Sequence, residues 1–301
     1  MHLDLYLVLA SSVVGLLLGI TGIGGGALMT PMLVLVFGIA PSAAISADLM
    51  ATLFMKPWGV LVHWRRRTIQ RRVVGLLTVG SLPAAFLGTY AMHLIGHTAV
   101  AERDLKMLLG AALIVGASAM ILRAVVSKRR TTPAKPVRLR TLATLAVGVV
   151  GGFMVGLTSV GAGSLILVCL MTIYPNLKSD QLVGTDLAQS IPLTLGASAG
   201  TLAFGHVAWG LTSSIIVGGV PAVIVGSLIS SRAANPAIRH VMTALVMLSG
   251  LKYIGLATPI VVAAATVALA VVAIMVVRSR PRDDQPVSPG TTSGRLERSL
   301  R

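Results

Sequence analysis

Two carboxylic acids stand inside otherwise apolar stretches of the sequence. Of the nine Asp and Glu residues, only Asp48 and Asp186 do so, and their surroundings match: residues 46–49 read Ser-Ala-Asp-Leu and residues 184–187 read Gly-Thr-Asp-Leu. A carboxylate inside a bilayer is costly and is retained mainly for function. Because burial favours the neutral form of the group, such an acid can take up and release a proton. The pair predicts proton coupling; the alternative is a structural acid that bonds to a helix start or a backbone break.

Two glycine clusters repeat one motif. Residues 19–28 read Gly-Ile-Thr-Gly-Ile-Gly-Gly-Gly-Ala-Leu, and residues 156–165 read Gly-Leu-Thr-Ser-Val-Gly-Ala-Gly-Ser-Leu. Glycine exposes backbone amides, and amides at a helix N-terminus attract anions. Two such loops that meet would form an anion site, with hydroxyl groups as further donors; the alternative is close helix packing through small residues. The predicted substrate-binding residues are Thr21, Gly22, Gly24, Gly25, Gly26, Thr158, Ser159, Gly161, Ala162 and Gly163.

One base and several polar residues accompany the acids. Lys56 lies two helical turns beyond Asp48. It can pair with an acid, contact an anion, or extend towards the basic loop that begins at residue 63. An acid repels an anionic substrate, which favours coupling or structure over direct contact for the two aspartates. The residues predicted to line the same path are Lys56, Thr185, Gln189 and Ser190.

The composition excludes a soluble protein. Hydrophobic residues make up 55% of the chain and charged residues 11%, whereas soluble domains carry about 25% charged residues. The net charge of +16 lies largely in short basic clusters, with five arginines in 63–72, seven basic residues in 123–140 and six from Arg278 onward. Such clusters between apolar segments are typical of cytoplasmic loops. The sequence therefore predicts an integral protein of the lipid bilayer and excludes nucleic acid as a partner.

No catalytic, cofactor or metal motif is present. The sequence lacks the G-x-S-x-G, H-E-x-x-H and Walker patterns. His63 and His206 stand at loops and do not form a metal-binding pattern, and the single Cys169 excludes an intrachain disulfide. We therefore expect neither an enzyme nor a bound cofactor, and the missing Walker motif argues against an ATP-driven pump.

Apolar segments of membrane-spanning length must position these residues. Two stretches, 3–38 and 139–175, are too long for one span and are interrupted by the glycine clusters, so each is predicted to be a helix, a break and a shorter returning helix. The chain is thus predicted to be an all-α integral membrane protein of about 8–11 hydrophobic segments. The uninterrupted segments are 42–62, 73–96, 105–126, 183–204, 211–231, 239–256 and 258–278.

The matches extend into a duplication with an offset of 137 to 138 residues. Gly80 matches Gly218 and Gly88 matches Gly226, as expected for two units of five elements. The predicted boundaries are a first repeat at 1–126, a basic cytoplasmic linker at 127–140, a second repeat with an extra helix at 141–278, and a disordered cytoplasmic tail at 279–301.

Charge indicates how the two repeats are oriented. The loop at 63–72 holds five arginines, and its counterpart at 203–210 holds neither lysine nor arginine. Equivalent loops of opposite character favour opposite sides of the membrane, hence inverted repeats with the N-terminus outside. A parallel duplication remains possible if each broken pair counts as one span.

These motifs resemble the signatures of the sulfite exporter TauE/SafE family, also called the toluene sulfonate uptake permease family. The resemblance lies in residues 19–31, 156–163 and 182–187, and extends over about 3–278. It implies a multi-pass permease of the bacterial inner membrane that moves sulfite, sulfoacetate and related organosulfur anions by secondary transport. The chain departs from the family pattern at Ser46-Ala47, where Gly-Thr is usual, and at Ser159 and Ala162 in the second cluster.

We therefore expect a proton-coupled secondary transporter that exports small sulfur-containing anions. The glycine loops would hold the anion, and Asp48 and Asp186 would carry the coupling proton. The alternative is a non-transporting membrane assembly or partner protein, in which the glycines and acids serve packing only. The expected partners are a small anionic substrate, a proton or other coupling ion and the bilayer, and a homo-oligomer remains open.

Overall fold

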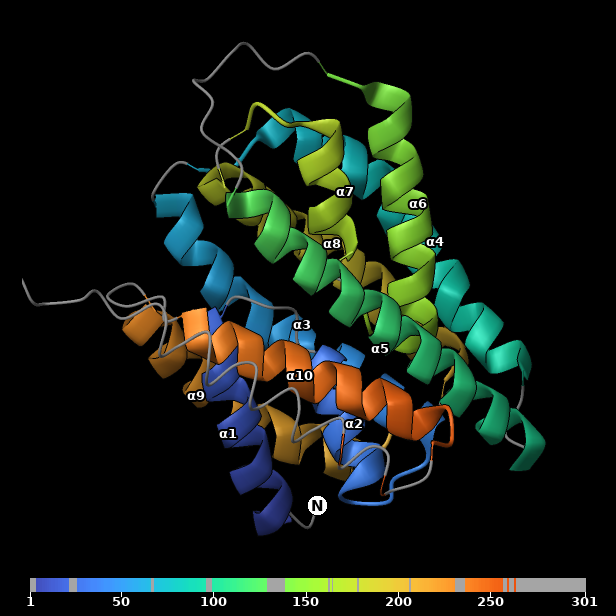
Figure 1. Cartoon of the computed structure of the whole chain (residues 1–301). Helices are drawn as coiled ribbons and strands as arrows, with labels where there is room; N and C mark the ends of the chain where they lie inside the picture. The colour runs from blue at the N-terminus through green and yellow to red at the C-terminus, as the bar shows by residue number, and fades with distance from the viewer. Residues whose placement is uncertain are drawn as a thin grey trace, which may run out of the picture.

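The computed structural model is all-helical over the residues it describes (Figure 1). Predicted segment 258–278 and the tail at 279–301 fall outside these residues, apart from positions 259 and 263. The described residues are 4–21, 26–65, 68–95, 99–128, 139–161, 163, 165–177, 179–205, 207–230, 236–256, 259 and 263.

Ten helices form in the described part of the chain, and they follow the predicted segments closely. The second glycine-interrupted stretch is a helix, a break and a shorter helix, as predicted. In the first stretch a long and a shorter helix flank residues 22–25, which lie outside the described residues. The helices are α1 (Leu5–Thr21), α2 (Gly26–Leu35), α3 (Pro41–Arg65), α4 (Arg71–Ile95), α5 (Ala99–Lys128), α6 (Thr141–Thr158), α7 (Leu165–Ile173), α8 (Ser179–Phe204), α9 (Trp209–Ser230) and α10 (Pro236–Tyr253).

The two sets of five helices are inverted relative to each other. The equivalent helices α5 and α10 pack together in antiparallel directions: a Cβ at Gly110 would lie 2.9 Å from Tyr253, while Met120, further along α5, accepts a hydrogen bond from Thr243, earlier on α10. In Figure 1, α1 starts at the bottom beside the N label, whereas its equivalent α6 starts at the top. Equivalent helices of a parallel duplication would run in the same direction, so the repeats are inverted, as the charge pattern predicts.

The repeats interlock through small residues. α1 packs on α9 of the other repeat, and α6 packs on α4 in the equivalent manner. A Cβ at Gly19 would overlap the Val223 carbonyl, and a Cβ at Gly156 would overlap that of Ala85. These two glycines open the two repeated motifs, so close packing accounts for the first residue of each cluster. The matched pairs Gly80/Gly218 and Gly88/Gly226 make similar close approaches.

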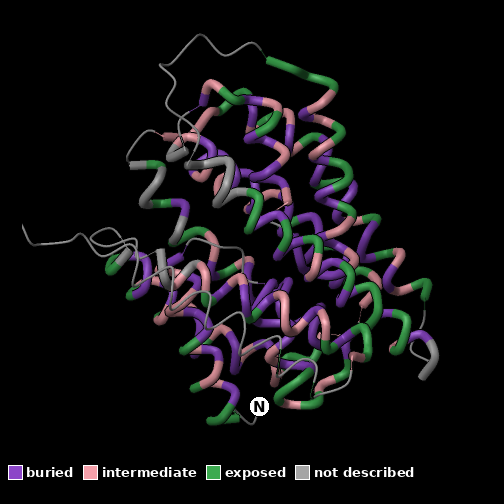
Figure 2. The backbone as a smooth tube through the Cα atoms, in the orientation of Figure 1, coloured by how far each residue is buried: buried purple, intermediate pink, exposed green. Residues whose placement is uncertain are grey.

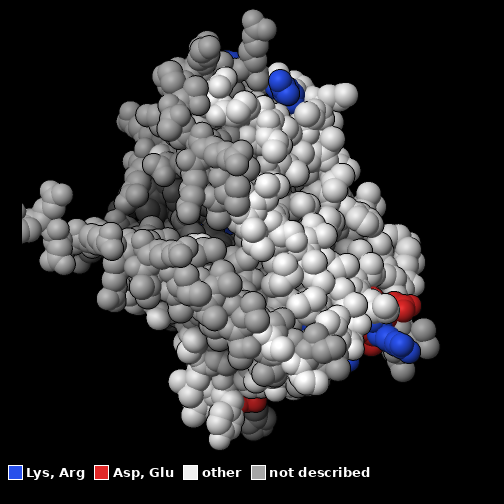
Figure 3. All heavy atoms as spheres, viewed as in Figure 1, with Lys and Arg blue, Asp and Glu red and all other residues white. Residues whose placement is uncertain are grey.

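The outside of the protein is apolar and much of its interior is polar. Leu142 is 83% exposed and Tyr6 is 77% exposed, whereas Asp48, Gln189 and Thr194 have no exposed surface. Figure 2 shows the buried faces turned inward, and in Figure 3 the charged side chains gather towards the ends of the molecule, with a mostly uncharged face between them. An exterior of this kind is stable in lipid and not in water. The protein is therefore an integral membrane protein.

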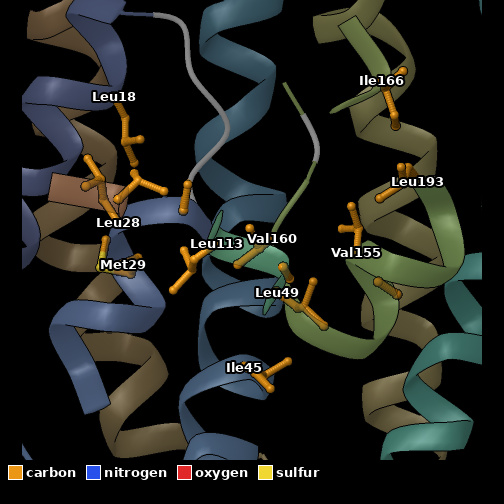
Figure 4. Close-up of a cluster of buried hydrophobic side chains, with 14 of the residues drawn as sticks. Leu18, Leu28, Met29, Ile45, Leu49, Leu113, Val155, Val160, Ile166 and Leu193 are labelled. Carbon is orange, nitrogen blue, oxygen red and sulfur yellow. The ribbon is translucent and has the colours of Figure 1, made fainter. Parts of the chain in front are cut away.

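Within the described ranges, four helices are long and apolar enough to cross a membrane: α4, part of α5, α6 and most of α9. α3 and α8 have similar lengths, 25 and 26 residues, and carry the two aspartates Asp48 and Asp186. α3 packs against α8 and α9, and α8 packs also against α4. Leu49 of α3 lies near Val155 and Val160 in the buried cluster of Figure 4. The two helices that carry the intramembrane aspartates thus lie among the others, as intramembrane charges require.

Candidate functional site

The break between α6 and α7 is built from residues in unusual backbone conformations. α6 ends at Ser159, which has φ 59° and ψ −3°, and Gly161 and Gly163 follow with φ 116° and 90°. Ser159 is the one non-glycine residue with positive φ among those described. A left-handed conformation costs a residue with a side chain roughly 1–2 kcal/mol. Ser159 is the left-handed C-cap of α6, and its amide donates to Val155 O.

The start of α2 touches the end of α6. Gly26, the first residue of α2, packs so closely on Ser159 that a Cβ there would overlap the Ser159 carbonyl oxygen and lie 2.6 Å from its Oγ. Any larger residue at position 26 would push the start of α2 away from Ser159. The start of the returning helix in the first repeat therefore meets the end of the first helix in the second repeat.

Asp48 lies at this meeting point. Its Oδ2 accepts hydrogen bonds from Ser159 Oγ at 2.5 Å and from Thr30 Oγ1 of α2 at 3.1 Å. Its Oδ1 is buried and has no hydrogen-bond partner among the described residues. The acid of the first repeat therefore binds the break of the second, and one of its oxygens remains available to a proton or a ligand.

Lys56 extends towards the other repeat. Its Nζ donates to Thr194 Oγ1 and, at 3.5 Å, to the Ser190 carbonyl on α8. It also interacts electrostatically with both Asp48 and Asp186. Since these partners all lie within the helix bundle, Lys56 does not extend towards the basic loop, and it links both acids at the contact between α3 and α8.

Asp186 and Gln189 are buried on one face of α8. They stand three residues apart, so their side chains are neighbours on the helix surface, and Ser190 follows at the next position. Both amide atoms of Gln189 lack a hydrogen-bond partner in the described part of the chain. We name Asp48, Lys56, Ser159, Asp186 and Gln189 the polar centre.

Three other predicted site residues donate their hydroxyl groups to backbone carbonyls of their own helices. Thr21 Oγ1 donates to Leu17 O at 2.8 Å, and Thr158 Oγ1 donates to Met154 O at 2.7 Å. Thr185 Oγ1 donates to Gln181 O and accepts from the Gln70 amide at 3.1 Å, so it ties α8 to the loop before α4.

Among the described residues of the second break, some backbone N–H groups already donate hydrogen bonds within the protein, and others do not. Those of Ser159, Val160 and Leu165 donate within the chain. An anion at this break would therefore be met by Gly161 and Gly163. Four predicted site residues lie outside the described residues: Gly22, Gly24, Gly25 and Ala162.

Sequence reasoning missed three contributors. Thr30 lies in the first motif but was not assigned a role, although its hydroxyl binds Asp48. Thr194 occupies the position equivalent to Lys56 at the 138-residue offset, a signal that could have identified it. Glu102 of α5 accepts from the Ser42 amide at 3.4 Å and from its hydroxyl at 2.5 Å, and so caps the start of α3. No sequence pattern indicated that cap.

Comparison with known proteins agrees with this architecture. Residues 7–253 match the profile of the family described as "Sulfite exporter TauE/SafE". "Probable membrane transporter protein YjnA" of Bacillus subtilis is 36% identical over 253 residues, covering 82% of this chain and 98% of the relative.

More distant relatives carry similar names. "Probable membrane transporter protein YdhB" of the same organism is 27% identical over 229 residues, covering 73% and 88% of the two chains. A "Probable membrane transporter protein" of Xylella fastidiosa is 27% identical over 233 residues, covering 74% and 83%. No solved structure matches. The chain is therefore a membrane transporter protein of the sulfite exporter TauE/SafE family.

Proposed function

We propose that the protein is a proton-coupled secondary transporter that exports small sulfur-containing anions such as sulfite or organosulfonates. It would act as a multi-pass protein of the bacterial inner membrane, without enzymatic activity. The family name supports the substrate class, and the organisms of its relatives, Bacillus and Xylella, support a bacterial membrane.

One observation carries the proposal: the polar centre joins both inverted repeats. Asp48 of the first repeat binds Ser159 at the break of the second, and Lys56 binds Thr194. In many transporters the substrate site lies where inverted repeats meet at broken helices. Movement of one repeat against the other would expose such a site alternately to each side.

The charges of the centre support coupling to protons. Two carboxylates and one ammonium carry a net charge of −1, which a buried site tolerates poorly. Uptake of protons by Asp48 and Asp186 would remove the repulsion towards an anion, which could then bind beside Lys56, Gly161 and Gly163. Proton binding would thus favour anion binding, so the flux of the anion would depend on pH.

Flux into or out of proteoliposomes tests the proposal. We expect sulfite or sulfonate flux that responds to an imposed pH gradient. Asp186→Asn should lower that flux by at least about tenfold, because an amide cannot carry the proton. Asp48→Asn/Asp186→Asn should remove the response to the gradient. Asp104→Asn, which changes an exposed acid on α5, is the matched control and should behave as the wild type.

Two outcomes would contradict separate parts of the proposal. If folded protein neither binds nor moves any member of a panel of sulfur oxyanions, the substrate assignment fails and a non-transporting assembly role gains support. If the double variant keeps its flux with unchanged pH dependence, the coupling role of the aspartates is wrong.

A further inference from the structure

Gln189 is a buried amide without hydrogen bonds. Its side chain has no exposed surface, and neither Oε1 nor Nε2 has a partner among the described residues. More than nine in ten buried polar groups in proteins are hydrogen-bonded, so each exception needs an explanation. An apolar side chain would avoid the cost of an unpaired amide. A ligand that forms hydrogen bonds with this amide would remove the cost, so the unpaired amide is suited to ligand binding.

The position of Gln189 ties it to the polar centre. Lys56 binds the carbonyl of Ser190, the next residue, and interacts electrostatically with Asp186, one turn earlier on the same helix face. Lys56 also interacts with Asp48, whose Oδ1 is unpartnered. Lys56 therefore connects the part of α8 that carries Gln189 with Asp48 and its unpartnered oxygen.

The unused hydrogen-bond donors and acceptors define which ligand would bind. An ammonium has three donors, and Lys56 uses two of them, on Ser190 and Thr194, so one is left. The Gln189 amide offers two donors and an acceptor, and Asp48 Oδ1 offers another acceptor when ionised. The protein's donors can bind the oxygen atoms of an anion. Its acceptors can be satisfied only if the ligand itself carries a hydrogen-bond donor. An anion with acceptor oxygens alone would leave the Gln189 carbonyl unpaired.

We propose that Gln189 binds the transported anion directly and selects anions that carry a hydrogen-bond donor, such as hydrogen sulfite or a hydroxyl-bearing sulfonate. This inference rests on the proposed function and narrows its substrate class. The first repeat has no equivalent amide, because Ala51 occupies the matching position. Selection therefore comes from the second repeat, while the cation comes from the first.

Two sulfonates that differ by one hydroxyl test the inference. Ligand-induced stabilisation of the purified protein against thermal unfolding, which follows affinity, would be measured with ethanesulfonate and 2-hydroxyethanesulfonate, together with flux of each. We expect the wild type to prefer the hydroxyl-bearing sulfonate by about tenfold, as one additional hydrogen bond implies. Gln189→Leu and Gln189→Met should lose the preference and, without ligand, unfold at the same temperature as the wild type or higher.

Thr201→Val is the matched control, since Thr201 is a buried polar residue of α8 whose hydroxyl donates to Ala197 O in its own helix. It should keep the preference. If both Gln189 variants keep the preference, or if both are less stable and bind the two sulfonates equally less well, Gln189 is structural and the inference is wrong. A Gln189-dependent preference in binding without any flux would support this inference while contradicting the proposed function.

Discussion

At the scale of single residues, the bond between Ser159 and Asp48 is the main link within the site. Ser159 stands where the first repeat has Gly22, in a conformation that suits glycine better. Its hydroxyl binds Asp48 Oδ2 at 2.5 Å across 111 residues of sequence. The chain therefore accepts backbone strain at Ser159 and gains a hydrogen bond to a buried acid.

Substitution of Ser159 separates these two effects. Ser159→Gly and Ser159→Ala both remove the hydroxyl, but only alanine retains the strain. We expect Ser159→Gly to be more stable than Ser159→Ala by about 1 kcal/mol in detergent unfolding. The pH at which flux is half-maximal should move equally in both variants, because both leave Asp48 without the same donor. Wild-type pH dependence in both would mean that this bond does not act on coupling.

At the scale of helices, glycine determines how closely the repeats approach. A Cβ at Gly156 of α6 would overlap the Ala85 carbonyl of α4 and lie 3.0 Å from its Cα. The contact is between backbones, so it cannot be relieved by a change of rotamer. In contrast, a Cβ at Gly75 of α4 would meet nothing within 4 Å. Glycines of one helix pair thus have different roles.

The contrast predicts opposite effects of the same substitution. Gly156→Ala should destabilise the protein by about 1–3 kcal/mol, because the α4–α6 interface would be overpacked. Gly75→Ala should be neutral or stabilise it by up to about 1 kcal/mol through helix propensity. Unfolding in detergent measures both. Equal effects would show that helix propensity, and not the interface, decides the stability at these positions.

At the scale of the whole molecule, the inverted repeats place equivalent residues in contact. Lys56 of α3 binds Thr194 of α8, and Thr194 is the residue of the second repeat that is equivalent to Lys56. The local twofold axis that relates the two repeats therefore passes between these two residues. The two repeats are similar in backbone but unequal in chemistry, with a cation on one and an amide on the other. Because only the first repeat has a lysine at this position, Lys56 is the one cation of the polar centre and interacts with both Asp48 and Asp186.

An exchange of the two residues tests that relationship. Lys56→Thr should lower flux at least about tenfold through loss of the cation, an effect of about 1.4 kcal/mol or more. Lys56→Thr/Thr194→Lys should recover part of that flux, since the ammonium would return to the same region from the opposite helix. Proteoliposome flux of the single and double variants gives the coupling between the sites. A double variant as inactive as Lys56→Thr would contradict the shared position.

The sequence alone determined membrane residence, the approximate extent of most helices and the duplication. Its loop charges favoured inverted repeats, and the antiparallel packing of α5 on α10 then decided the inversion. The properties that the sequence determined depend on the hydropathy of each segment, on the glycine clusters and on the charge of single loops. Each is a property of a short stretch of sequence, and the duplication follows from comparing such stretches with each other. Asp48, Lys56 and Gln189 were identifiable as candidates for the same reason: a polar residue inside an apolar segment is conspicuous.

Only the tertiary structure decided which candidates meet. Asp48 binds the break of the opposite repeat, Lys56 extends across to α8, and Glu102 caps α3, and each contact joins residues 60 or more positions apart. Matching motifs indicate that two breaks are equivalent, but they do not indicate which acid approaches which break. That pairing depends on the interlocking of α1 with α9 and of α4 with α6, because backbone contacts at Gly19 and Gly156 fix how the two repeats lie against each other.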